Sequence, residues 1–216
     1  MNMKAMKYLL ASALCMLVST ACSGNRKSDT MTNEPAASAA QSEPVKLTGK
    51  ALVVFFSHAG DNYGVGNISV GNTKIVADYI SAITGADQFE IKTKKYDGMA
   101  YTPLTELAKE EQQNGELPPF EGSVDVSKYE TIFIGGPVWW GTYPQVMFTF
   151  FKKYDLNGKT IIPFTTHEGS GLGSCVRDLK EAYPNATFLD AFSIYGHDVR
   201  EGKDRVEKWL KKLGFE

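Results

Sequence analysis

The sequence predicts an α/β fold, a three-layer α/β/α sandwich with a doubly wound, five-stranded parallel sheet in the order 2-1-3-4-5. Two observations carry this prediction. From about Lys50 to the C-terminus, apolar runs alternate five times with amphipathic segments, which is the pattern of repeated strand–helix units. The central apolar runs are uninterrupted, as expected for parallel strands that are buried on both faces. With five strands, the order 2-1-3-4-5 is the natural choice.

The strand–helix units follow one another along the chain. The expected strands are 51–56, 87–91, 131–136, 160–164 and 187–195, and the expected helices are 74–83, 103–114, 144–154, 174–183 and 204–213. The first helix carries an apolar stripe at helical spacing, formed by Ile75, Val76, Tyr79, Ile80 and Ile83.

Local signals mark several helix ends. Thr102 offers a cap to the second helix, and Pro103 suits its first turn. Asn114-Gly115 ends that helix, and Pro144 opens the third one. These signals support the segmentation that the apolar runs indicate.

The N-terminus has the pattern of a secretory signal peptide. Lys4 and Lys7 precede an apolar run from Tyr8 to Val18, which is too short for a comfortable membrane span. The end of this segment, Ser19-Thr20-Ala21-Cys22, resembles the lipobox of bacterial lipoproteins, and the resemblance implies a lipid on Cys22. The alternative is an ordinary cleaved signal with an incidental cysteine.

A composition shift then divides the chain. Residues 22–48 are rich in Ser, Ala, Thr and Pro and have almost no large apolar side chains, so we expect a flexible linker between a signal peptide at 1–21 and a folded domain at 49–216. The expected protein is exported and lipid-anchored to a bacterial membrane.

Charge and cysteine content exclude several classes of function. The net charge of −2 with three His gives no basic footprint for nucleic acid. Inside the expected domain Cys175 is the only cysteine, so no internal disulfide forms there, and we expect Cys175 to be a packed residue. His197 and Asp198 are expected in a solvated turn, and we predict no metal site.

Ligands in such sheets bind beyond the carboxyl ends of the strands, at the switch point in strand order. This rule selects the loops Ser57–Thr73, Gly136–Tyr143 and Thr165–Ser174. The first loop ends in Gly71-Asn72-Thr73 directly before a helix, where free backbone N–H groups suit an anion. It reads equally well as a plain strand-to-helix turn with Thr73 as the cap.

The other two loops offer different chemistry. GGPVWWGTYP places adjacent Trp139 and Trp140 beside a flexible Gly141, which suits stacking on a flat ligand, although at least one of the two indoles is expected to pack under a helix. TTHEGSGLGS adds hydroxyls and exposed amides before another helix. Tyr96, Met99 and Tyr101 follow the second strand and could border the site, but we expect them to serve packing.

The segments FFSHAG…GNTKIVADYI, IFIGGPVWWGTYP and PFTTHEGSGLGS together resemble the flavodoxin-like proteins. The resemblance spans about Lys50 to the C-terminus and implies a flavodoxin-like fold with FMN as the ligand. It implies that the phosphate is bound by Ser57, Asn72 and Thr73, with backbone from Gly71 and Ala59. It further implies an isoalloxazine site made by Pro137, Val138, Trp139, Trp140 and Gly141, and an opposite wall made by Thr165, Thr166, His167, Glu168, Gly169 and Gly171.

The first loop departs from this family, because 13 residues from His58 to Val70 separate Ser57 from Gly71. We expect the inserted residues 61–70 either to cover the ligand or to contact a partner. With FMN bound, the WWG segment, the acidic character of the expected domain and the lack of a nearby cation predict a low-potential, one-electron carrier. We expect it to exchange electrons with an unidentified redox partner protein and to touch the membrane only through its lipid. One alternative is an FMN-dependent NAD(P)H or quinone oxidoreductase. Another is a binding module on the same fold that has lost the flavin.

Overall fold

The central sheet of the computed structural model is parallel throughout. Its order is β4 (Asp87–Glu90), β1 (Ala51–Phe55), β5 (Thr131–Pro137), β6 (Thr160–His167) and then β7 (Thr187–Phe188), with β8 (Phe192–Tyr195) also pairing with β6. In terms of the five expected strands this order is 2-1-3-4-5, so the predicted fold and strand order are confirmed.

The structure describes residues 49–215. The predicted signal peptide (1–21), the linker (22–48) and lipidation of Cys22 lie outside the described residues.

The fifth strand is interrupted where β6 contains a proline. The N–H of Leu189 donates to the carbonyl of Ile161 at 3.1 Å, so alternate residues of β6 from Ile161, including Pro163, face the fifth strand. Pro163 has no N–H to give to a ladder. The pairing register accordingly shifts by one residue between β7 and β8, and the strand that the sequence predicts as continuous forms two pieces.

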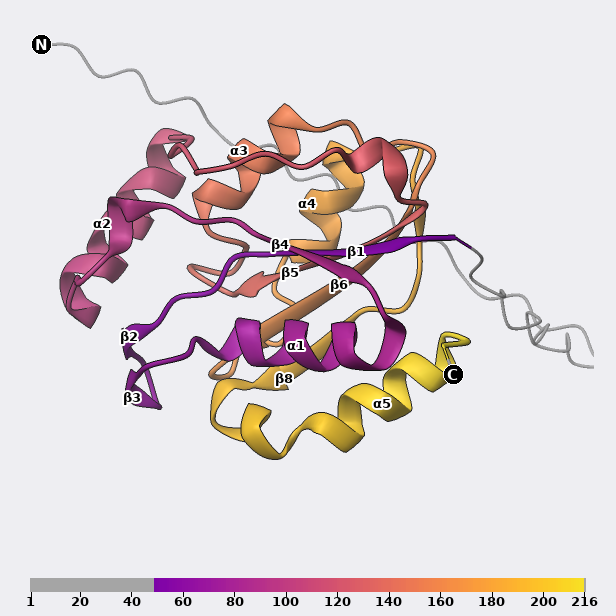
Figure 1. The fold of residues 1–216 in the computed structure, drawn as a ribbon. Coiled ribbons are helices and arrows are strands. Elements are labelled where there is room, and N and C mark those ends of the chain that lie inside the picture. The colour runs from indigo at the N-terminus through magenta and orange to yellow at the C-terminus, as the bar shows by residue number, and fades with distance from the viewer. Residues whose placement is uncertain (1–48, 216) are drawn as a thin grey trace, which may run out of the picture. The chain divides into compact units, whose positions relative to one another are not determined.

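Helices cover both faces of the sheet (Figure 1). One face carries α1 (Asn72–Thr84) and α5 (Lys203–Lys212), and the other carries α2 (Tyr101–Asn114), α3 (Gln145–Lys153) and α4 (Cys175–Ala182). Successive residues of β1 point to opposite faces, because Val53 belongs to the core under α1 whereas Val54 belongs to the core under α3. Burial on both faces explains the uninterrupted apolar strands.

Shorter elements complete the domain. The first loop contains an antiparallel hairpin of β2 (Gly60–Asn62) and β3 (Gly66–Ile68), which we call the insertion hairpin (residues 60–68). Short 3-10 helices lie at Lys94–Tyr96, Val126–Lys128 and Gly196–Glu201.

The start of α2 differs from the expectation. The helix begins at Tyr101 and Thr102 is helical, so the prediction that Thr102 caps it is wrong. Ala100 occupies the cap position without a side-chain hydrogen bond, and the carboxylate of Asp61 in the insertion hairpin accepts from the Tyr101 N–H at 3.0 Å. A residue distant in sequence therefore satisfies this helix end. The other end of α2 is as predicted, with Gly115 in the left-handed conformation.

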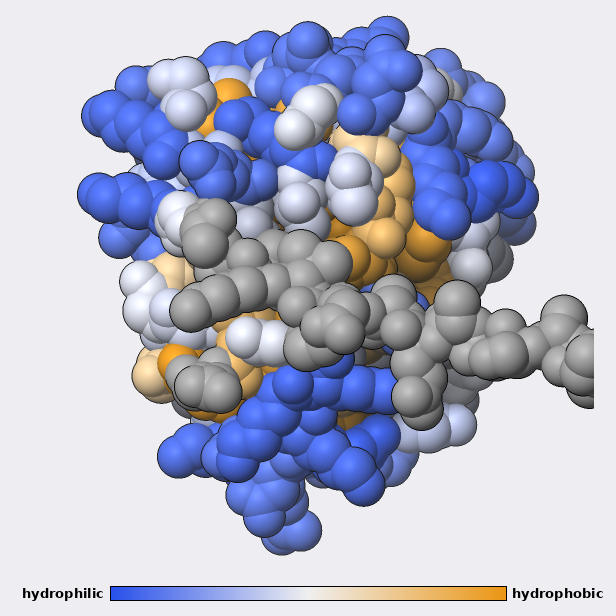
Figure 2. Space-filling view, turned by 90° about the vertical axis from the view of Figure 1, so that its right-hand side faces the viewer, coloured by the Kyte–Doolittle hydropathy of each residue, from blue (hydrophilic) through white to orange (hydrophobic). Residues whose placement is uncertain are grey.

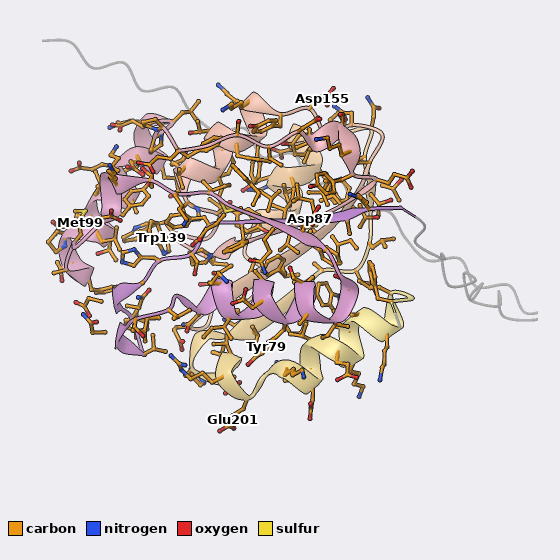
Figure 3. The ribbon with its side chains drawn as sticks, in the orientation of Figure 1. Tyr79, Asp87, Met99, Trp139, Asp155 and Glu201 are labelled. Atoms are coloured by element: carbon orange, nitrogen blue, oxygen red, sulfur yellow. The ribbon has the colours of Figure 1, made fainter. Side chains whose placement is uncertain are left out.

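The two ends of the sheet differ in what surrounds them. Trp139 lies at the carboxyl end of the strands, and Asp87 and Asp155 lie toward the amino end (Figure 3). Figure 2 shows the amino end, whose visible face is mainly hydrophilic with hydrophobic residues at separate places near its middle. Among residues 49–215, no helix is long and apolar enough to cross a membrane.

Cys175 is buried at the start of α4, as expected for a packed residue. Burial raises the pKa of its thiol to about 12, so the side chain remains a protonated part of the core.

Candidate functional site

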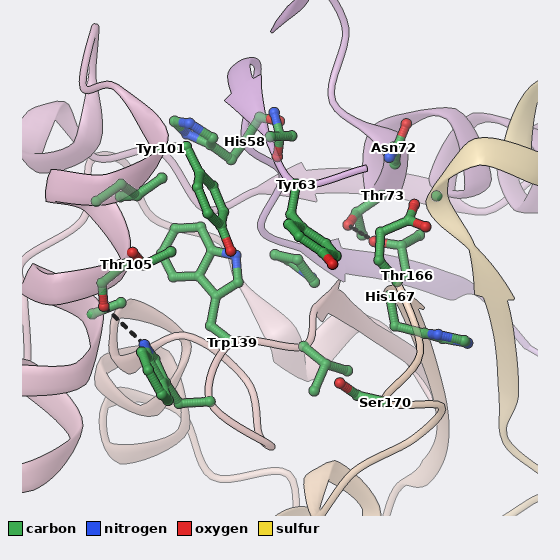
Figure 4. Close-up of a pocket in the computed structure, with 18 of the residues that line it drawn as sticks. His58, Tyr63, Asn72, Thr73, Tyr101, Thr105, Trp139, Thr166, His167 and Ser170 are labelled. Carbon is green, nitrogen blue, oxygen red and sulfur yellow. Dashed lines mark hydrogen bonds between the residues drawn. The ribbon is translucent and has the colours of Figure 1, made fainter. Parts of the chain in front are cut away.

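A pocket of about 420 Å³ opens at the carboxyl ends of β1, β5 and β6 (Figure 4). All three loops selected from the sequence contribute to it, together with the insertion hairpin and one face of α2. Its lining consists of His58, Asp61, Asn62, Tyr63, Asn72, Thr73, Tyr101, Leu104, Thr105, Ala108, Pro137, Val138, Trp139, Trp140, Thr166, His167, Glu168, Ser170 and Gly196.

Close packing at Gly71 joins the two ends of the first loop. A Cβ at Gly71 would lie 2.2 Å from Ser57 Oγ and 2.6 Å from the carbonyl oxygen of His58, so only glycine allows this approach. Ser57 Oγ also accepts from the Lys74 N–H at 3.0 Å, which satisfies one donor in the first turn of α1. The contact closes the base of the insertion, which forms a separate hairpin, and Ser57 remains beside the start of α1.

The N-terminus of α1 faces the pocket with backbone N–H donors that are unpaired within the described chain. Within residues 49–215, no hydrogen bond uses the backbone N–H groups of Asn72 and Thr73. The buried hydroxyl of Thr73 lies 2.7 Å from that of Thr166 and ties the first loop to the third. Such a helix terminus suits a bound anion.

A tight turn in the second loop directs the two tryptophans apart. Trp139 and Thr142 exchange backbone hydrogen bonds of 2.8 and 3.2 Å, and Trp140 and Gly141 between them have φ of 50° and 84°. These are the positive angles of a type I′ turn. Trp140 is the only described non-glycine residue with positive φ, a sparsely populated conformation for a bulky side chain that is typical of functional loops.

Each indole has a different environment. The Trp140 Nε1–H donates to the Thr105 carbonyl at 2.8 Å, which holds this half-exposed ring against α2. Trp139 is met edge-on by Phe56, Tyr96 and His58, with ring centroids 5.4 to 6.0 Å away. Trp139 therefore has a fixed position at the base of the pocket (Figure 4).

The third loop is ordered by its own polar groups. The Thr165 hydroxyl donates to the Gly171 carbonyl at 2.9 Å, and the Gly169 N–H donates to His167 Nδ1 at 2.9 Å. The Glu168 carboxylate accepts from the His197 N–H at 3.0 Å and lies 2.6 Å from His197 Nδ1. His197, which we expected in a solvated turn, thus positions a residue of the pocket.

Two pocket histidines favour the neutral form. Burial lowers the pKa of His58, against the opposing effect of Asp97 and Asp61, and its Nε2 is a buried atom without a hydrogen-bond partner among the described residues. Burial also lowers the pKa of His167, with Glu168 acting in the opposite direction.

The structure brings together many of the residues selected from the sequence. Nine of them line the pocket: Asn72, Thr73, Pro137, Val138, Trp139, Trp140, Thr166, His167 and Glu168. Seven do not line it and lie in the same loops or behind them: Ser57, Ala59, Gly71, Gly141, Thr165, Gly169 and Gly171. Ser57 and Ala59 line a second, adjacent cavity behind the insertion hairpin.

Sequence reasoning missed most of the α2 face, whereas the insertion, for which we considered a position over the ligand, lines the pocket through Asp61, Asn62 and Tyr63. Tyr101, for which we preferred packing over a place at the border of the site, lines the pocket together with Leu104, Thr105 and Ala108. Their spacing along a helix places them on one face, but no signal in the sequence says that this face borders the site. Among residues 49–215, no cluster of His, Cys, Asp and Glu that could hold a metal ion is present.

Comparisons with known proteins agree with this fold. The family model for flavodoxins matches residues 50–213, so the chain belongs to the flavodoxin family. Among solved structures, a protein of Bacteroides uniformis ATCC 8492 assigned as a flavoprotein has 25% sequence identity and a TM-score of 0.59, over 76% of this chain and 98% of that chain. No curated protein matches the chain.

Two further solved structures share the fold. A protein of Bacteroides eggerthii DSM 20697, also assigned as a flavoprotein, has 24% identity and a TM-score of 0.58, over 78% of this chain and 100% of that chain. A flavoprotein of Lactobacillus acidophilus NCFM in complex with FMN has 20% identity and a TM-score of 0.55, over 76% of this chain and 99% of that chain.

The low pKa of His58 predicts a pH-dependent stability. As the pH falls below about 6.5, the unfolded chain takes up the proton before the folded chain does, so the free energy of unfolding decreases toward the folded-state pKa. We expect His58→Asn to flatten this decrease below about pH 6.5, measured by urea unfolding at several pH values. An unchanged pH dependence in the variant would contradict the buried, neutral state of His58.

Proposed function

We propose that the chain binds FMN in this pocket and acts as a low-potential, one-electron carrier. The proposal rests on one observation: groups that suit a phosphate and groups that suit a flat ring lie in the same cavity. Unused N–H groups at the start of α1 suit a phosphate, and the tryptophan turn beside them suits a flat ring. FMN carries both groups, and the volume of about 420 Å³ lies within the range of roughly 300–1,000 Å³ for small-molecule sites.

The phosphate end of the pocket fits a ligand held by neutral donors. The amides of Asn72 and Thr73, the Thr73 hydroxyl and Ser57 would bind the phosphate, with Gly71 allowing the backbone to come close. Lys74 is the cation nearest in sequence, and its ammonium group pairs with Asp78 on α1. Amides and hydroxyls would therefore carry the binding.

The ring end of the pocket would lie between the second and third loops. Pro137, Val138 and Trp139 would line one face of the isoalloxazine, and Thr166 and His167 would lie at its pyrimidine edge. Gly141 gives the turn that carries Trp139 and Trp140 its second positive φ at low conformational cost. FMN, when bound, supplies the electron-transfer chemistry.

Charges in the pocket support a low potential. Asp61 and Glu168 line it, whereas no Lys or Arg of the described chain does. Carboxylates disfavour added negative charge nearby, so this lining makes reduction of a bound flavin harder.

The phosphate site is tested by Gly71→Ala. A Cβ would meet Ser57 Oγ and the His58 carbonyl, so the loop must shift. The charge-assisted hydrogen bonds that the loop donates to the phosphate would then weaken. We expect FMN affinity, measured by fluorescence titration, to fall about tenfold or more, with little change for riboflavin, which has no phosphate. Ser69→Ala, an exposed change in the same loop, should leave both affinities unchanged. Equal losses for FMN and riboflavin would argue against this phosphate site.

The one-electron role is tested by spectroelectrochemical titration of the FMN-loaded protein. We expect two resolved one-electron steps, with the second below the potential of free FMN because of Asp61 and Glu168. A single two-electron step with rapid reduction by NADPH would instead favour an FMN-dependent NAD(P)H or quinone oxidoreductase. A protein that stays colourless with added FMN would favour a binding module without flavin.

We further propose that the protein is exported and held at a bacterial membrane by a lipid on Cys22, with residues 22–48 as the tether to the domain at 49–216. The charged, apolar and small-residue pattern of the N-terminus supports this. Labelled palmitate should appear on the full chain in the membrane fraction of a bacterial host. Cys22→Ala should lose the label, and Cys175→Ala should keep it because Cys175 is buried. Label on the Cys22→Ala protein would contradict the proposal.

A further inference from the structure

The insertion hairpin is attached to α2 at one side of the pocket. The Asp61 carboxylate accepts from the first N–H of α2, at Tyr101, with a distance of 3.0 Å. Tyr63 and Tyr101 also pack against each other, with ring centroids 5.8 Å apart and an interplanar angle of 31°. A charge-assisted hydrogen bond and an aromatic contact therefore tie the hairpin to the helix.

The turn of the hairpin reaches the opposite side of the pocket. A Cβ at Gly64 would lie 3.1 Å from the Cγ and Cδ atoms of Glu168, so the turn packs directly on this side chain. Glu168 is in turn held by the backbone and ring of His197, at 3.0 and 2.6 Å. The hairpin thus extends across the pocket from α2 to the third loop.

Tyr63 is placed over the pocket by these contacts. Figure 4 shows its ring in the middle of the pocket, with Trp139 on one side and Thr166 on the other. Its exposed fraction is 64%, the highest of the large hydrophobic residues in the described chain, compared with 51% for Trp140 and 36% for Tyr101. A ring that the fold holds over a cavity and leaves open to solvent gains burial when a flat ligand enters.

The other aromatic rings of the pocket already have partners. Trp140 is hydrogen-bonded to Thr105, and the ammonium group of Lys109 lies 5.0 Å from its ring centroid. Trp139 packs roughly perpendicular to three neighbouring rings. Among residues 49–215, Tyr63 has a single aromatic contact, with Tyr101. It is therefore the aromatic side chain with the most unused surface above the site.

We propose that Tyr63 packs on the flavin ring and forms the outer wall of the site, a role that rests on the proposed FMN binding. The same ring position restricts the approach of a second planar molecule to that side of the flavin. The insertion hairpin then acts as a specificity element. It hinders stacking of a nicotinamide on the flavin face that Tyr63 covers, and it leaves the exposed edge of the flavin accessible for electron transfer.

The experiment compares Tyr63→Ala with Tyr63→Phe in the FMN-loaded protein. Tyr63→Ala removes the stacking ring, so we expect FMN affinity to fall about three- to tenfold. We also expect flavin fluorescence to rise and acrylamide to quench it more strongly. Tyr63→Phe keeps the ring and should match the parent protein in affinity and in acrylamide quenching. Val70→Ala, an exposed apolar residue of the same insertion that does not line the pocket, is the matched control and should change nothing.

The outcomes separate this proposal from the proposed function. Binding of FMN by the parent protein with no change in affinity or quenching in Tyr63→Ala would overturn the role of Tyr63 and leave FMN binding intact. Equal effects of Tyr63→Ala and Val70→Ala would overturn it as well, since they would reflect the loop and not the ring. A parent protein that fails to bind FMN would overturn both proposals.

Discussion

The site depends on one close approach of the backbone, the contact of Gly71 with Ser57 and with the carbonyl of His58. It brings the end of β1 and the start of α1 together although the insertion separates them in sequence. Because this contact closes the base of the insertion, the N-terminus of α1 stays at the switch point of the sheet. The insertion is then free to form a structure of its own without displacing the donors of α1.

A second set of contacts positions α2 as a wall of the pocket. Asp61 accepts from its first N–H, and Glu111, buried to 1% exposure, accepts from the Tyr96 hydroxyl at 2.8 Å and pairs with Lys95 at 2.8 Å. Burial, with help from Glu111, raises the pKa of Tyr96, so its hydroxyl stays protonated and keeps donating. Tyr96 in turn packs on Trp139. The buried carboxylate and the indole at the base of the pocket thus belong to one connected network.

The prediction from sequence succeeded where the signal is local and periodic. Uninterrupted apolar runs predicted the parallel strands, and Gly115 predicted the end of α2. It failed where a distant group decides the outcome. Thr102 carries the chemistry of a cap, but Asp61 takes over that role from another loop. The break between β7 and β8 follows from Pro163 on the neighbouring strand, which no pattern within 187–195 reveals.

The sequence by itself determined the sheet, its strand order and the three loops that meet at the carboxyl ends of the strands. The reason is that the spacing of apolar residues and the connections between successive elements can be read directly from the sequence. The tertiary structure alone decided what surrounds those loops. It separated Trp139 from Trp140 through a turn with two positive φ angles, turned Tyr101 into a lining residue and carried Tyr63 over the pocket. These placements arise from contacts between segments far apart in sequence, and no periodic pattern among neighbouring residues predicts such contacts.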